Sequence, residues 1–149
     1  MRVALFGGTG FVGSYLVDEL LEQGVSKKKV LVVDLDMMFG DQAGIFNVID
    51  PKSLAQLHGE EEIDSTMVED LVIETESGVG LLQSPPRPEE SELVSPDMID
   101  VVLGILRRNW DYVILDTANA IQDLAIMLLE SVDKGVYVLT PEFLSVKNA

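Results

Sequence analysis

Short apolar runs alternate along this chain with longer segments whose apolar residues recur at helical spacing. An uninterrupted apolar run predicts a strand buried on both faces, and helical spacing predicts an amphipathic helix. The predicted strands are residues 2–6, 29–36, 79–84, 111–116 and 135–140. The predicted helices are residues 11–23, 96–108 and 120–132, together with 61–75, where a helix passes into an extended segment. This alternation predicts an α/β fold with a parallel sheet of about five strands covered by helices on both faces, in three layers.

The remaining segments fit one domain over residues 1–149. Residues 37–60 are mixed, and Pro51 suits the start of a short helix. The segment "PPRPEESE" is expected to be a charged, proline-rich loop, because strand and helix patterns resume directly after it. Trp110, just before a predicted strand, is expected to pack against the edge of the sheet.

The charge balance narrows the choice of partners. Ten basic residues against 26 acidic ones give a net charge of −16, and mean hydropathy is +0.24. Such a surface repels nucleic-acid phosphate and anionic lipid, so any phosphate site must rely on local backbone donors. The chain has no cysteine, and its apolar runs are far shorter than the roughly 20 residues of a membrane-spanning helix. We therefore expect a cytoplasmic protein that does not bind nucleic acid or insert into membranes.

The most informative motif is the glycine-rich turn "GGTGFVG" between the first predicted strand and helix. It contains Gly8-x-Gly10-x-x-Gly13, and Asp34 lies 21 positions beyond Gly13, at the end of the second predicted strand. Glycines let the backbone approach a pyrophosphate, the helix start donates N–H groups, and the aspartate can accept from a ribose diol. A turn that binds nothing is the alternative. The candidate phosphate-binding residues are Gly7, Gly8, Thr9, Gly10, Phe11, Val12 and Gly13.

Other polar residues lie at the ends of predicted strands. In an open parallel sheet the carboxyl ends of the strands share one edge, where ligands bind. Beside the glycine turn, that edge is expected to bring together Asp34, Asp36, Ser84, Asp116 and Thr140.

Residues 1–24, "RVALFGGTGFVGSYLVDELLEQG" after the first Met, resemble the first β-α unit of extended or atypical short-chain dehydrogenase/reductases. The resemblance implies NAD(P) bound over the glycine turn. Those enzymes also use a Tyr-x-x-x-Lys pair. Here the residues four positions after Tyr15, Tyr112 and Tyr137 are Glu, Asp and Pro, so dehydrogenase catalysis is not expected.

Residues 28–149 resemble a truncated ParA/MinD-type P-loop ATPase of the CpaE/TadZ-like, pilus-assembly and localisation branch. The matching segments are "KKVLVVDLDMMFGDQAGIF", "PPRPEESELVSPDMID", "WDYVILDTANAIQD" and "VYVLTPEFLSVKNA". The resemblance implies that Asp34 and Asp36 lie near the catalytic water and metal. It also implies that Asp116 is the Walker B residue, holding a Mg²⁺-bound water. Alternatively, Asp116 and Thr117 only cap the following segment.

The phosphate loop departs from that family's pattern, K-G-G-x-G-K-T/S-T. Phe6 and Phe11 replace the two lysines, and Val12 replaces the hydroxyl residue that binds Mg²⁺. Because these groups stabilise the charge that develops during phosphoryl transfer, ATP hydrolysis is not expected. ADP or ATP binding stays open, with Mg²⁺ required only for a triphosphate.

Two resemblances in one chain suggest a composite, engineered or otherwise; a natural degenerate ATPase is the alternative. The Rossmann-like part favours the strand order 3-2-1-4-5 and the P-loop-like part 3-2-4-1-5; we favour the second, because that part is longer. The leading functional hypothesis is a nucleotide-binding domain without turnover. The alternatives are a scaffold or pilus-localisation protein with no ligand and, third, an active ATPase. A homodimer through an exposed strand near residues 135–140 is also possible.

Overall fold

The computed structural model describes residues 2–6, 11–24, 26, 29–117 and 123–137. Six strands form one sheet in the order β3-β4-β2-β5-β1-β6. Their bounds are β1 Arg2–Phe6, β2 Val30–Asp34, β3 Ile73–Glu74, β4 Gly80–Leu82, β5 Tyr112–Thr117 and β6 Lys134–Tyr137. The strands β4, β2, β5, β1 and β6 are parallel and correspond to the five that the sequence predicts. When these five parallel strands are numbered 1 to 5 along the chain, their order in the sheet is 3-2-4-1-5, which is the order favoured from the sequence. The alternative order 3-2-1-4-5 is wrong because β5 lies between β2 and β1.

The helices agree with the predictions except in the irregular segments. They are α1 Phe11–Glu22, α2 Gln42–Ile45, α3 Ser65–Leu71, α4 Pro96–Asn109 and α5 Asp123–Ser131, with 3₁₀ helices η2 Leu54–Leu57 and η3 Pro88–Leu93. The proline-rich segment expected to be a loop contains η3, because Pro88 suits the first turn of a helix. The predicted element at 61–75 divides into α3 and the two-residue strand β3, which pairs antiparallel to β4.

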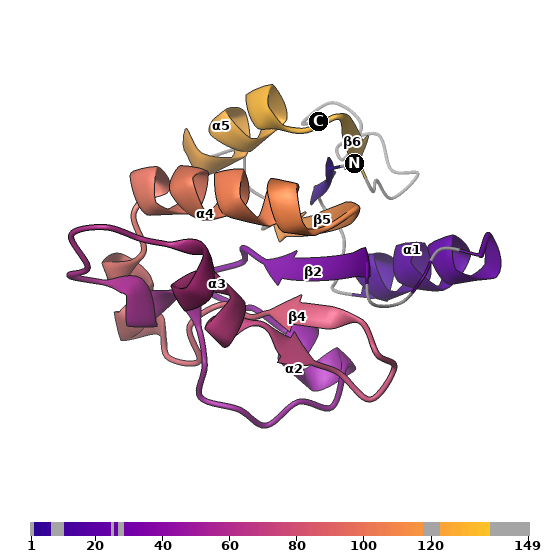
Figure 1. Cartoon of the computed structure of the whole chain (residues 1–149), viewed down its shortest axis with the longest axis horizontal. Coiled ribbons are helices and arrows are strands. Elements are labelled where there is room, and N and C mark those ends of the chain that lie inside the picture. Colours follow the sequence, from indigo (N-terminus) through magenta and orange to yellow (C-terminus); the bar gives the residue numbers. More distant parts are fainter. Residues whose placement is uncertain (1, 7–10, 25, 27–28, 118–122, 138–149) are drawn as a thin grey trace, which may run out of the picture.

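Helices cover both faces of the sheet because side chains of each strand alternate between faces. Leu31 and Val33 of β2 join the larger apolar cluster, to which η2, α3, α4 and α5 contribute. Val30 and Val32 point the other way, into a cluster with Val17 and other residues of α1. Figure 1 shows α4 and α5 side by side on their side of the sheet. The three-layer architecture is therefore confirmed.

Helix α4 has well-matched ends. The Ser95 hydroxyl accepts a hydrogen bond from the Met98 backbone N–H at 3.2 Å, Pro96 occupies the first turn, and Arg107 and Arg108 lie in the last. The cap and the complementary end charges stabilise the helix that spans the larger apolar cluster.

We expect Ser95→Ala to lower the free energy of unfolding by about 1 kcal/mol, because one amide at the helix start loses its acceptor. Urea unfolding measures this. Ser26→Ala, at an exposed position before β2, is the matched control and should be neutral. Equal effects of the two substitutions would contradict a capping role for Ser95.

Within the part of the chain that the structure describes, no helix has both the length and the apolar character needed to cross a membrane.

Candidate functional site

The candidate site lies at the carboxyl edge of the sheet, where β2, β5 and β1 end. Asp34 and Asp116, the last or near-last residues of adjacent strands, are register partners. Phe6, the last residue of β1, is opposite Thr117. The chain therefore enters the glycine turn beside Asp116. Gly7, Gly8, Thr9 and Gly10 lie outside the described residues, as does Thr140.

Asp34 is almost completely buried, with 1% of its surface exposed. Its Oδ1 accepts from the Asp36 backbone N–H at 3.1 Å, and its Oδ2 accepts from the Gln42 backbone N–H at 3.2 Å. Burial raises the pKa of Asp34 to about 7, although these two amides oppose the shift. The charges of Asp116 and Asp36 raise it further. A carboxyl group is thus fixed in place while keeping its proton close to neutral pH.

Gln42 links the two strand-end aspartates. It is fully buried at the start of α2, and its Nε2 donates a hydrogen bond to Asp116 Oδ2. Its backbone meanwhile donates to Asp34, so one residue holds both carboxyl groups. Sequence reasoning missed Gln42. Its only signal was an uncharged polar residue in the segment that follows the strand-end aspartates.

Asp116 is 5% exposed, and burial raises its pKa to about 6. The Gln42 side chain opposes the shift, while the nearby carboxylates of Asp41 and Asp36 add to it. Asp34 and Asp116 are thus two buried acids with raised pKa values at one sheet edge, and the described residues place no cation beside them. This combination is typical of a binding site for a cationic or metal-bound ligand.

Asp36 has a local role. Its Oδ1 accepts from the backbone N–H groups of Met38 and Phe39, at 3.2 and 3.0 Å. Asp36 therefore fixes the turn that carries the chain from β2 toward α2. The Phe39 side chain at the tip of that turn is 80% exposed.

Gly40 and Ser84 close the site on the β4 side. A Cβ added at Gly40 would lie 1.8 Å from Ser84 Oγ and 2.7 Å from Asp34 Oδ2. Only glycine fits at this position, because the backbone passes directly over the Asp34 carboxyl group. Ser84 is buried beside it, so the predicted gathering of Asp34, Ser84 and Asp116 at one edge is observed.

The described residues contain no cluster of three or more histidine, cysteine, aspartate or glutamate side chains that could hold a metal ion by itself. The Asp116 carboxylate can nevertheless accept hydrogen bonds from water on Mg²⁺ when phosphate oxygens and water complete the metal's coordination. The side chains here therefore fit a metal that arrives with a phosphate ligand.

Helix α1 begins at Phe11, directly after the glycine turn. Its first backbone N–H groups lack helical acceptors, which is the property that binds phosphate at a helix start. Phe11, Val12 and Gly13 thus occupy the positions that the sequence assigns to a phosphate cradle. That role stays a prediction.

The fold of the chain matches that of known structures. A ParA family ATPase from Chlorobium tepidum superimposes with a TM-score of 0.79 at 21% identity, over 99% of this chain and 64% of that one. The chain has the fold of the ParA/MinD-type ATPases. The septum site-determining protein MinD from Pyrococcus horikoshii, solved with Mg-ADP, has a TM-score of 0.76 at 20% identity, over 99% of this chain and 61% of its own.

One curated relative aligns over the whole chain. An uncharacterized ATP-binding protein of Methanocaldococcus jannaschii is 28% identical over 153 aligned positions, covering 100% of this chain and 56% of its own length. This chain thus spans a little over half of that relative. No family model matches the chain. These comparisons extend through residues 1–24, and they support neither the short-chain dehydrogenase resemblance nor a composite.

Proposed function

We propose that this domain binds an adenine nucleotide together with Mg²⁺ at the carboxyl edge of its sheet and does not hydrolyse it. The observation that carries the proposal is the buried pair Asp34 and Asp116, held by Gln42 beside the end of β1. The glycine-rich segment follows directly on Phe6, the last residue of β1 at this edge. The relative named as ATP-binding and the MinD structure with Mg-ADP support the choice of ligand.

Each part of the site has a defined task in this proposal. The turn at residues 7–10 and the start of α1 bind the diphosphate through backbone N–H groups. Asp116 accepts hydrogen bonds from water on Mg²⁺. Asp34, which keeps its proton to about pH 7, places less negative charge near a phosphate than an ordinary aspartate would. The Gln42 contact keeps Asp116 oriented before the ligand arrives.

The absence of turnover follows from the phosphate loop. Phe6 and Phe11 stand where the lysines of the resembled family would neutralise β- and γ-phosphate charge. Losing preorganised positive charge at a transition state typically costs several kcal/mol. Phosphate release from Mg-ATP should therefore be indistinguishable between the protein and its Asp116→Ala variant; release that depends on Asp116 would show an active ATPase.

Isothermal titration with ADP and ATP, each with and without Mg²⁺, and with NAD⁺ and NADP⁺ tests the ligand. We expect binding of ADP and ATP that strengthens with Mg²⁺. Asp116→Asn should remove that strengthening, weakening Mg-ATP binding about tenfold, the size of one charged hydrogen bond. The control Asp100→Asn, exposed on α4, should bind as the unmodified protein does.

The two alternatives give other results. Tighter binding of NAD⁺ or NADP⁺ than of ADP, independent of Mg²⁺, would favour the dinucleotide hypothesis that the glycine spacing suggests. No heat with any ligand would favour the scaffold hypothesis. That hypothesis draws support from β6, an edge strand of the described sheet whose Val136 is 38% exposed. Light scattering would then show self-association.

A further inference from the structure

A cavity lies at the amino end of the sheet, opposite the candidate functional site. It encloses about 380 Å³ and is lined by Glu69, Val72, Glu74, Gly80, Asn109 and Trp110 among others. Gly80 begins β4 opposite Leu31 of β2, and Trp110 directly precedes β5. The length of the strands therefore separates this cavity from Asp34 and Asp116.

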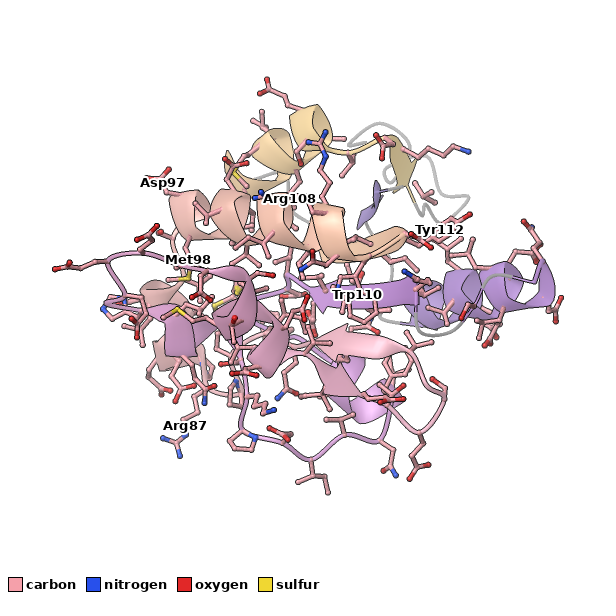
Figure 2. All side chains as sticks on the ribbon, in the orientation of Figure 1. Arg87, Asp97, Met98, Arg108, Trp110 and Tyr112 are labelled. Atoms are coloured by element: carbon pink, nitrogen blue, oxygen red, sulfur yellow. The ribbon has the colours of Figure 1, made fainter. Side chains whose placement is uncertain are left out.

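Trp110 forms the aromatic wall of the cavity. A Cβ added at Gly80 would lie 2.7 Å from Trp110 Cη2, so the indole packs directly against the backbone of β4. The half-buried ring also contacts the larger apolar cluster, as the sequence predicted for a residue at the sheet edge. Figure 2 shows Trp110 between the end of α4 and β4. The ring is thus held firmly while part of it faces the cavity.

Glu69, exposed on α3, lines the same cavity as this ring. Its Oε1 accepts from Asn109 Nδ2 at 2.6 Å, and the same amide group donates to Ser65 Oγ at 2.8 Å. Glu74 provides a second carboxylate on the cavity wall. Neither glutamate forms an ion pair with another residue that the structure describes.

The basic side chain nearest in sequence does not neutralise these carboxylates. Arg108 donates its Nε–H to the Gly104 carbonyl at 3.0 Å, along its own helix. Figure 2 shows Arg108 and Trp110 on different sides of the α4 ribbon. The cavity thus combines an indole, a pre-positioned carboxylate and a second acid, without a cation from the described part of the chain.

We propose that this cavity binds an alkylguanidinium group. A guanidinium is planar and weakly hydrated, stacks on aromatic rings, and donates parallel N–H bonds to a carboxylate. The Glu69 carboxylate, oriented by Asn109, accepts the two parallel N–H bonds of the guanidinium. The plane of the guanidinium stacks on the indole ring of Trp110. The ligand is either a small free guanidine or an arginine side chain presented by a partner protein. This proposal is independent of nucleotide binding at the other edge of the sheet.

The fluorescence of Trp110 reports binding directly, because the chain has one tryptophan. We expect agmatine to change this emission saturably, while equal concentrations of sodium chloride do not. Glu69→Gln keeps the acceptor for Asn109 but removes the charge, and it should weaken binding about tenfold. The control Asp70→Asn removes the same charge one residue away, outside the cavity, and should leave the midpoint unchanged.

The capped peptide acetyl-Gly-Arg-Gly-amide distinguishes the two sources. Saturable binding of the peptide as well as agmatine would indicate an arginine from a partner protein, and binding of agmatine alone a free guanidine. Equal weakening by Glu69→Gln and Asp70→Asn would overturn the proposal, because it would show general attraction to an acidic surface. A linear response to both probes would overturn it as well. Because nucleotide titration is read separately by heat, failure here leaves the nucleotide proposal intact.

Discussion

Asp116→Asn is expected to stabilise the unliganded protein by about 2 kcal/mol at pH 8, while leaving its stability below pH 4 unchanged. The substitution removes a buried carboxylate whose folded pKa is about 6, well above the 3.8 of an ordinary aspartate. The asparagine oxygen can still accept the hydrogen bond from Gln42 Nε2. Stability gained with loss of Mg²⁺-dependent binding would show that this acid is kept for function.

The sign of the pH dependence follows from proton binding. Between about pH 4 and pH 6 the folded protein keeps a proton on Asp116 that the unfolded chain has released. Stability therefore falls as pH rises through this window, and the full cost is present above the folded pKa. Ionisation of Asp34 likewise lowers the stability as pH rises, over a window that extends to about pH 7.

Chemical denaturation of the two proteins from pH 3.5 to pH 8 measures this difference. The curves should coincide at the acidic end and separate progressively up to about pH 6. An Asp116→Asn variant that is less stable at every pH by the same amount would be inconsistent with a costly buried charge. It would instead show that the carboxylate serves only as a structural hydrogen-bond partner.

Gly40→Ala is expected to lower the free energy of unfolding by about 2–3 kcal/mol, because the added methyl group has no space. It would overlap Ser84 Oγ, approach Asp34 Oδ2 to 2.7 Å and lie 3.0 Å from the Asp36 carbonyl oxygen. Ser84 can rotate, but Asp34 is held by two backbone N–H groups and cannot move without losing them. The substitution should therefore also weaken Mg-nucleotide binding.

Gly44→Ala is the matched control for this prediction. It lies in α2 on the same segment, and a Cβ there would meet no atom within 4 Å. Alanine should be neutral or stabilising by up to about 1 kcal/mol, since it favours the helix. The double variant Gly40→Ala/Ser84→Ala should recover part of the loss, measured as coupling in a double-mutant cycle. If Gly40→Ala is as harmless as Gly44→Ala, the close approach over Asp34 is not a constraint.

Prediction from sequence succeeded where the signal was local. The apolar runs "VLVVD" and "YVILD" predicted strands buried on both faces, and their terminal aspartates lie together at one edge of the sheet, as expected. Prediction was weakest between β2 and β4, where short helices depend on contacts with distant residues. Gln42 illustrates this, because its partner Asp116 is 74 residues away.

The sequence by itself determined the class of fold, the buried strands and the carboxyl edge on which the strand-end aspartates lie. Periodicity and strand-end chemistry are properties of neighbouring residues, so they can be read along the chain. The family resemblance already favoured the strand order that places β5 between β2 and β1. The tertiary structure decided how closely the side chains of Asp34 and Asp116 are joined through Gln42. It also decided that burial raises their pKa values, and that Trp110 and Glu69 share a cavity at the other end of the sheet. These features arise from packing between segments far apart in the chain, and no local pattern encodes them.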